Sequence, residues 1–158
     1  MMRLLVLSDS HSDYISMKMA IDNTRDADVI VFLGDGALDL EAIKNTPLLS
    51  GKKIVAVRGN CDGSFCSYPK LAIEEFAGVR TYCTHGHTEM VKYGYQKLIE
   101  AASSYNARLI LFGHTHTPYT HYEDGVYMMN PGSVRENSCG IVDITENGIM
   151  CYTKKIVQ

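Results

Sequence analysis

The chain has 158 residues, of which 46% are hydrophobic and 21% are charged, and its formal net charge is −3. This length and composition are typical of one globular domain, so we expect a single domain over residues 1–158. The negative charge gives no general attraction to nucleic acid or to an anionic membrane, so we expect neither as a partner.

The N-terminal segment is too short to be a signal peptide. Its apolar run, Leu4–Leu7, has four residues and soon meets Asp9 and His11, where a cleavage site would be needed. No stretch approaches the roughly 20 apolar residues of a transmembrane helix. The five cysteines are odd in number and show no paired framework, which is usual for reduced thiols. We therefore expect a soluble, cytoplasmic protein.

The first part of the chain alternates apolar runs with helical patterns. Three runs predict buried strands, at Leu4–Leu7, Val29–Leu33 and Lys53–Val57. Apolar residues at helical spacing predict a helix that Ser12 caps and a second, short helix near Leu38–Asn45.

The second part is predicted to be mostly strands around one helix. Leu71–Phe76 and Val79–Thr84 are a strand pair that turns at Gly78. The apolar face of the helix consists of Tyr95, Leu98, Ile99, Ala102 and Tyr105. The remaining strands are Leu109–Phe112, Val126–Met129, Cys139–Ile144 and Ile149–Lys154, with a type I′ turn at Asn147-Gly148. A β-α-β-α beginning and an antiparallel end indicate an α/β sandwich.

Residues of the kinds that bind metals follow five of these strands. They are Asp9, His11, Asp35, Asn60, His85, His114 and His116. Ligands gather at the carboxyl ends of strands in open α/β folds, so we expect the topology to bring these residues together. Within Gly113-His114-Thr115-His116, two histidines two residues apart would project to the same side of an extended backbone.

This set of two carboxylates, one amide and four imidazoles suits Mn²⁺, Fe²⁺, Zn²⁺ or Ni²⁺. Seven ligands are too many for one ion that keeps an open position, but they suit two ions that share a carboxylate. Asp35 is the expected bridge, because both of its oxygens can coordinate and it lies between Gly34 and Gly36. We expect two divalent ions as cofactors, with Mn²⁺ as the first choice.

Two such ions favour the hydrolysis of a small phosphate ester. With neutral histidines, two dications and two aspartates leave a site charge of about +2, which suits an anionic substrate. Two metals ~3.5–4 Å apart stabilise the attacking and leaving oxygens of an in-line displacement, and they lower the pKa of bound water towards ~7. The expected nucleophile is a metal-bridging hydroxide.

Five motifs resemble, in the same order, those of the calcineurin-like metallophosphoesterases. They are Asp9-Ser10-His11, Gly34-Asp35, Gly59-Asn60-Cys61-Asp62, His85-Gly86-His87 and Gly113-His114-Thr115-His116. The size of the chain, the Gly-Asn-Cys-Asp form and Asn130-Pro131-Gly132-Ser133 are similar to the small prokaryotic phosphodiesterases of the YfcE type. The resemblance covers nearly the whole chain. It implies a four-layer α/β/β/α sandwich, with two mixed sheets flanked by helices, and it suggests a homodimer.

The resemblance also implies how the ligands divide between the two ions. One ion would be held by Asp9, His11 and His116, and the other by Asn60, His85 and His114, with Asp35 as the bridge. The resemblance thus implies a dinuclear phosphodiesterase.

Cys61 departs from the family pattern, because many members carry a histidine there whose implied role is to protonate the leaving oxygen. A thiol with a reference pKa of about 8.5 is a poor acid for that task, so we expect diesters, or esters with good leaving groups, as substrates. Asp62 then has no imidazole to orient and is expected to bond groups behind the ligands.

Several residues have two open interpretations. Cys61 and His87 are candidate catalytic residues, although Cys61 as a nucleophile would duplicate the hydroxide. His87 either contacts the substrate phosphate or lies exposed beside His85. Arg58 is a candidate substrate-binding residue that either clamps phosphate or forms a salt bridge at the sheet edge. Asn60 could instead occupy a left-handed backbone position.

Two other functions stay open. A phosphomonoesterase, including a protein phosphatase, is disfavoured by Cys61 and by the short chain. A non-catalytic scaffold similar to the retromer subunit would have this fold with altered ligands, whereas every ligand position is intact here.

Overall fold

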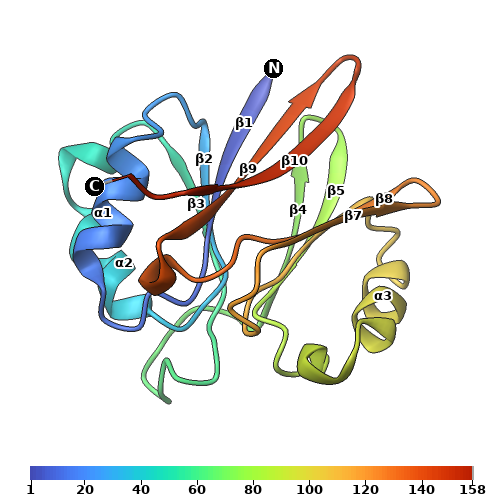
Figure 1. Cartoon of the computed structure of the whole chain (residues 1–158), viewed down its shortest axis with the longest axis horizontal. Coiled ribbons are helices and arrows are strands. Elements are labelled where there is room, and N and C mark those ends of the chain that lie inside the picture. The colour runs from blue at the N-terminus through green and yellow to red at the C-terminus, as the bar shows by residue number, and fades with distance from the viewer. Residues whose placement is uncertain (158) are drawn as a thin grey trace.

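Two five-stranded sheets form the centre of the molecule in the computed structural model, which describes residues 1–157 (Figure 1). Across the first sheet lie β10 (Gly148–Lys155), β9 (Ser138–Thr145), β1 (Met2–Leu7), β2 (Val29–Phe32) and β3 (Lys53–Ala56). Across the second lie β4 (Leu71–Phe76), β5 (Val79–Thr84), β6 (Leu109–Leu111), β8 (Val126–Asn130) and β7 (Tyr119–Glu123). Each sheet combines parallel and antiparallel neighbours, which confirms the predicted mixed sheets. Residue 158, the last of the predicted domain, lies outside the described residues.

Helices cover the outer face of each sheet (Figure 1). The first sheet is covered by α1 (Tyr14–Asp22) and α2 (Ala37–Lys44), and the second by α3 (Gln96–Ser103). Short 3₁₀ turns lie at η1 (Pro47–Leu49), η2 (Val91–Tyr93) and η3 (Val134–Glu136). The order of helix, sheet, sheet and helix confirms the four-layer sandwich. No helix in residues 1–157 is long and apolar enough to cross a membrane.

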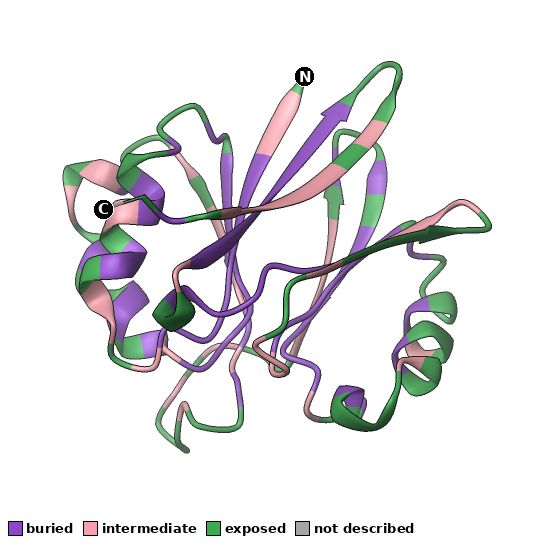
Figure 2. Ribbon diagram, in the orientation of Figure 1, coloured by how far each residue is buried: buried purple, intermediate pink, exposed green. Residues whose placement is uncertain are grey.

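The side chains of β1 show how these layers are held together. Leu4 and Val6 are buried in the core between the two sheets, whereas Leu5 and Leu7 are buried between the first sheet and its helices. Successive side chains of a strand alternate between faces, so a strand covered on both faces needs an apolar residue at every position. The central strands are accordingly the most buried part of the molecule (Figure 2).

Two hairpin turns differ from the prediction. The turn before β10 is not type I′ at Asn147-Gly148, because Asn147 lies outside the left-handed region and Gly148 already pairs with Thr145. Two successive positive φ angles, as type I′ requires, occur at Ala77-Gly78, at 47° and 80°, and at Asp124-Gly125, at 49° and 83°. The turn at Asp124-Gly125 joins β8 to the unpredicted strand β7.

Two details of the helices also differ. Asp13 caps α1, since its carboxylate accepts the Ser16 N–H at 3.0 Å, and the predicted cap Ser12 is therefore wrong. On α3, Leu98 and Ala102 are buried as expected, but Ile99 is 40% exposed because it points away from the second sheet.

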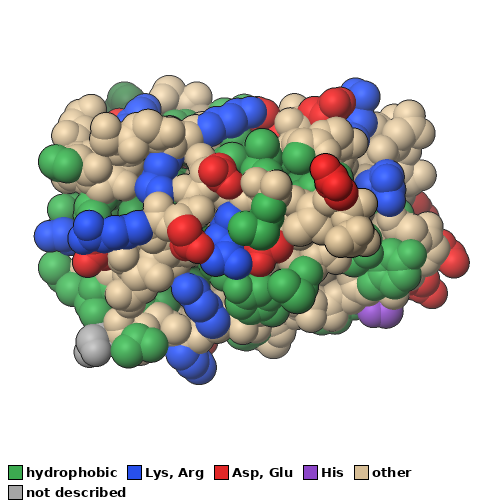
Figure 3. Space-filling view, turned by 90° about the horizontal axis from the view of Figure 1, so that it is seen from above, with side chains coloured by type: hydrophobic (Ala, Val, Ile, Leu, Met, Phe, Trp, Pro, Cys, Tyr) green, Lys and Arg blue, Asp and Glu red, His purple; other side chains and the backbone are tan. Residues whose placement is uncertain are grey.

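The carboxyl ends of the parallel strands lie at the lower edge of the molecule in Figure 1. The opposite end, seen from above in Figure 3, carries Lys and Arg side chains interspersed with Asp and Glu. The histidines predicted from the sequence therefore lie at the end away from this mixed surface.

Candidate metal centre

Five loops from the carboxyl ends of the strands meet at one place. The Asp9 N–H donates to the Gly34 carbonyl at 2.9 Å, which joins the loops after β1 and β2. The Gly113 N–H donates to the His85 carbonyl at 2.9 Å, and the His114 N–H donates to Asp9 Oδ2 at 3.0 Å. These bonds bring the residues of both sheets into one cluster.

Two glycines allow the loops to approach this closely. A Cβ on Gly59 would overlap Asp35 Oδ1 and lie 2.6 Å from the Asp35 backbone nitrogen. A Cβ on Gly113 would overlap the Ser8 hydroxyl and lie 2.9 Å from Asp9 Oδ2. Any larger residue at either position would push a candidate ligand out of place.

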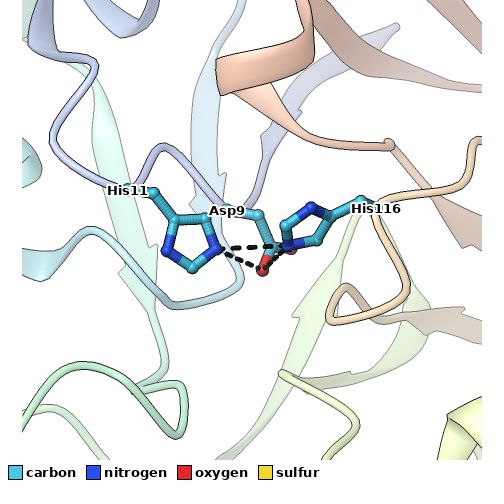
Figure 4. A group of neighbouring side chains, drawn as sticks. All are labelled: Asp9, His11 and His116. Carbon is cyan, nitrogen blue, oxygen red and sulfur yellow. Dashed lines mark hydrogen bonds and ion pairs between the residues drawn. The ribbon is translucent and has the colours of Figure 1, made fainter.

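Asp9, His11 and His116 form the first half of the cluster (Figure 4). His116 Nε2 lies 3.2 Å from Asp9 Oδ1 and 3.2 Å from His11 Nε2. His11 Nε2 lies 3.5 Å from Asp9 Oδ1. Ligand atoms ~2.1 Å from one ion and at right angles are ~3 Å apart, so this spacing suits a shared divalent ion.

His85 is the centre of the second half. Its Nε2 lies 3.1 Å from Asn60 Oδ1, 3.2 Å from Asp35 Oδ2 and 3.2 Å from His114 Nδ1. Asn60 lies outside the left-handed region of the backbone, so the alternative explanation for this residue is wrong. The predicted second group of ligands therefore also lies together.

Asp35 lies between the two halves and faces both through a single oxygen. Oδ2 is 3.2 Å from His85 Nε2 and 3.9 Å from His11 Nε2. Oδ1 accepts the Cys61 N–H at 2.7 Å. Oδ2 is therefore the oxygen that faces both halves, and coordination by both carboxylate oxygens stays a prediction, because Oδ1 accepts one N–H and keeps a second lone pair.

Asp9 provides the clearest indication that this cluster accepts a cation. Its Oδ2 accepts from the Ser8 hydroxyl at 2.5 Å and from the His114 N–H, but its Oδ1 is buried and has no hydrogen-bond partner. A buried carboxylate oxygen is normally paired. The unpaired oxygen faces the ring nitrogens of His11 and His116, so the residues fit a divalent ion.

Other groups orient the imidazoles from behind. The His85 Nδ1–H donates to the Leu33 carbonyl at 2.6 Å, and the His116 Nδ1–H donates to Glu136 Oε1 at 3.2 Å. Each bond leaves Nε2 directed into the cluster, which is the usual arrangement of metal-binding histidines. Glu136 was not predicted, because nothing in the sequence distinguishes it from other exposed glutamates.

In the second half, the pKa values of His85 and His114 shift in opposite directions. Burial, the largest influence, acts to lower the pKa of His85, but the hydrogen bond with Asp35 and the charge of Asp9 raise it overall. Burial and the neighbouring His85 lower the pKa of His114 to about 4. Burial acts to raise the pKa of Asp35, but its bond with His85 brings it well below its usual range. In the metal-free cluster the contact between His85 and Asp35 therefore favours the charged form of each group.

Backbone strain is concentrated in the same residues. Among residues 1–157, eleven non-glycine residues have a positive φ, and five of them are the candidate ligands Asp9, His11, Asp35, His114 and His116. Asp and His are among the residues that tolerate this region best, and strain of this kind is common at functional sites. The extended backbone that we expected for the two histidines after β6 is therefore wrong. The tight turn instead directs His114 and His116 to different halves of the cluster.

Asp62 holds two of these loops in place. Its carboxylate accepts four backbone N–H groups, those of Asp35, Gly36, Ala37 and Gly59, at 2.7–2.8 Å. Asp62 therefore supports the candidate ligands without being one of them, as expected. Its bonds to Gly36 and Ala37 also cap the N-terminus of α2.

The remaining predicted residues lie around the cluster with different contacts. His87 is half-buried with its ring centroid 5.4 Å from that of His85, and its Nδ1 is buried without a partner. The Arg58 guanidinium donates to the Gly63 carbonyl at 3.2 Å, in its own loop. Burial, followed by Asp35, raises the pKa of the Cys61 thiol, which keeps it protonated.

A cleft of about 320 Å³ opens beside the cluster. His11, Asp35, Cys61 and Arg135 are among the residues that line it. Arg135 was not predicted as a site residue. The available signal was its position two residues after the Asn130-Pro131-Gly132-Ser133 motif, whose Ser133 hydroxyl donates to the Asp9 carbonyl at 2.8 Å.

Comparisons with known proteins identify the family to which the chain belongs. The calcineurin-like phosphoesterase superfamily domain matches residues 2–147. The phosphodiesterase MJ0936 of Methanocaldococcus jannaschii is 28% identical over 98% of this chain and 95% of its own length. A predicted phosphoesterase from Streptococcus pneumoniae is 25% identical, with a TM-score of 0.74 over 97% of this chain and 98% of its own.

The fold is also found in Vps29 of Entamoeba histolytica, whose structure was solved in complex with Zn²⁺. This protein is 16% identical, with a TM-score of 0.72 over 99% of this chain and 100% of its own. At that identity the likeness concerns the fold alone. Together with its clusters of histidine and aspartate, the matched family model and the named phosphodiesterase show that the chain belongs to the calcineurin-like phosphoesterase superfamily and is a metal-dependent phosphoester hydrolase.

Proposed function

We propose that this hydrolase is a dinuclear phosphodiesterase that acts on small phosphate diesters. The observation that carries the proposal is the pair of ligand groups on either side of Asp35 Oδ2, together with the unpaired Oδ1 of Asp9. The relationship to a named phosphodiesterase over almost the whole chain supports the preference for diesters.

We expect the two ligand groups to divide as the family resemblance implies. One ion would be held by Asp9, His11 and His116, and the other by Asn60, His85 and His114, with Asp35 shared between them. Two divalent ions supply positive charge for the non-bridging oxygens and lower the pKa of a bound water. Mn²⁺ remains our first choice among Mn²⁺, Fe²⁺, Zn²⁺ and Ni²⁺, all of which accept oxygen and nitrogen ligands.

The chain itself provides orientation and charge around the phosphate. Arg135 lines the cleft and has no ion-pair partner within residues 1–157, so its guanidinium is available to an anionic ester. The protonated Cys61 thiol in the same cleft is a poor acid for a leaving alkoxide. A substrate with a good leaving group needs no strong acid, which favours diesters of that kind.

The experiment is a comparison of bis-p-nitrophenyl phosphate with p-nitrophenyl phosphate, using the chain loaded with Mn²⁺, Fe²⁺, Zn²⁺ or Ni²⁺. We expect faster hydrolysis of the diester, and loss of that activity in His114→Ala. His121→Ala is the matched control, because His121 lies on β7 and pairs with the exposed Glu123. Preference for the monoester would overturn the proposal and favour a phosphomonoesterase.

The second candidate is a non-catalytic scaffold, because Vps29, a vacuolar sorting protein by name, has the same fold. The complete ligand set of this chain favours the enzyme. A small phosphate ester as partner, a homodimer and a cytoplasmic location remain predictions from the sequence.

A further inference from the structure

A second cavity adjoins the polar cleft and has a different chemical character. It has a volume of about 480 Å³, within the ~300–1,000 Å³ that is typical of small-molecule sites. Leu38, Phe65 and Tyr68 are the large apolar and aromatic residues that line it. Ala37, Leu38 and Asp62 line both this cavity and the cleft beside the metal cluster, so the two are direct neighbours.

The apolar side chains here are exposed to an unusual degree. Phe65 is fully exposed at 102% and Leu38 is 85% exposed. Neither residue contributes to the folded core, and large apolar side chains gathered beside a cleft are typical of binding surfaces. Tyr68 is half-buried, and its hydroxyl donates to the Glu41 carboxylate, which fixes its ring in the wall of the cavity.

The charges around the cavity restrict what it accepts. Glu41 and Asp62 are its acidic residues, and the Asp62 carboxylate is already neutralised in part by four N–H donors. These N–H donors include those at the start of α2, so this helix end is not free for an anion. Of the residues that the structure describes, no Lys, Arg or His lines the cavity, and the nearby Lys44 is paired with Glu41 at 3.4 Å. An uncharged ring therefore fits this cavity better than a second anionic group, which would find no unpaired cation there.

We propose that this cavity binds the ester group of the substrate, and that this group is an uncharged aromatic ring. The proposal rests on the proposed function, because the phosphate must lie in the adjoining cleft beside Arg135. A ring in the cavity would contact Phe65 and Tyr68 by stacking and Leu38 by apolar contact. The substrate class is thus a phosphate ester with an aromatic or heteroaromatic group and no further phosphate on it.

The test is calorimetric binding of phosphonates to the Mn²⁺-loaded chain. Phenylphosphonate and methylphosphonate share the anionic head group, and each has one organic substituent, so their affinity ratio reports on the ring alone. We expect phenylphosphonate to bind about tenfold tighter, as partial burial of a ring predicts. We expect 4-carboxyphenylphosphonate to lose most of that advantage.

Variants then locate the ring. The double variant Leu38→Ser/Phe65→Ser should lower the ratio to about two or less, because both apolar contacts are removed. Both residues are exposed, so the variant should fold as the parent does. Met150→Ser is the matched control, since Met150 is 57% exposed on β10, at the other end of the fold.

The outcomes separate this inference from the proposed function. Equal affinity for the two phosphonates, or an unchanged ratio in the double variant, overturns the aromatic site even if the chain hydrolyses bis-p-nitrophenyl phosphate. Failure to hydrolyse the diester and to bind either phosphonate, with metal present, overturns both.

Discussion

The Asp62 carboxylate accepts the backbone N–H of Asp35 at 2.8 Å and so fixes the residue that faces both halves of the metal cluster. Asp62 reaches across from the loop after β3, and Gly59 in that loop has no room for a side chain beside Asp35. The position of Asp35 Oδ2 therefore depends on a residue that is not itself a ligand.

Asp62→Asn should destabilise the chain and weaken metal binding together. An amide keeps one acceptor oxygen and presents an NH₂ group to the remaining N–H donors, so we expect a loss of about 2–4 kcal/mol in the free energy of unfolding. Urea unfolding without Mn²⁺ measures the loss of stability, and the added stability with Mn²⁺ reports on metal binding. Asp124→Asn, an exposed turn residue at φ 49°, is the control. Equal stability of the two variants would contradict the conclusion that Asp62 holds the two loops in place.

The two histidines of the second half should titrate far apart in the metal-free chain. NMR titration should find the pKa of His85 above the ordinary value of about 6.5 and that of His114 near about 4. Asp35→Asn should lower the pKa of His85, because burial then acts without its partner. A pKa of His85 that stays raised in this variant would count against the contact with Asp35 as the cause.

These shifts also set opposite pH dependences of stability. The raised pKa of His85 means that its contribution is present below about pH 6.5 and is lost as pH rises through the raised value. The lowered pKa of His114 means that its contribution is present above about 6.5 and is lost as pH falls towards about 4. Metal affinity should weaken as pH falls, because protons compete for His85. Metal binding that is independent of pH would exclude this competition.

Arg135→Ala should impair substrate binding without loss of metal. Removing one charge-assisted contact to phosphate should lower kcat/KM about tenfold, mainly through KM. Arg58→Ala is the comparison, and we expect it to have a smaller effect, because the Arg58 guanidinium bonds Gly63 in its own loop. A larger effect at Arg58 than at Arg135 would reverse this assignment.

We expect substitutions of Cys61 to change which esters the chain hydrolyses, and to have little effect on the rate with esters that have good leaving groups. Cys61→Ser should hydrolyse bis-p-nitrophenyl phosphate within about twofold of the parent, since a protonated thiol donates little. Cys61→His should increase hydrolysis of alkyl esters, because imidazolium can protonate a poor leaving group. Loss of all activity in Cys61→Ser would instead favour the thiol as a nucleophile.

The sequence predicts the core strands well and identifies seven candidate ligands that the structure brings together, because each of these motifs lies at or shortly after the end of a predicted strand. The bounds of Leu71–Phe76 and Val79–Thr84 agree with the structure to the residue. Strand β7 was missed because Tyr119–Glu123 is an edge strand with mostly exposed residues and no apolar alternation. Asp124-Gly125, which follows this strand, is nevertheless a typical sequence of a type I′ hairpin turn.

What the sequence could not provide depends on contacts between distant segments. Arg135 and Glu136 reach the cluster because η3 packs against the Asp9 loop, where the Val134 N–H donates to the Ser8 carbonyl at 2.9 Å. The single oxygen with which Asp35 faces both halves is set by Cys61 across 26 residues. The motif that precedes Arg135 is a signal in the sequence, but these contacts themselves leave no local pattern.

The dinuclear centre is the central claim, and metal analysis tests it most directly. The chain should be purified without chelator, supplied with Mn²⁺, freed of excess ion and measured for bound metal per chain, beside His116→Ala. We expect close to two ions in the parent and about one in the variant, because His116 serves one half of the cluster only. A content that stays near zero in the parent, or an equal content in both proteins, would contradict the account.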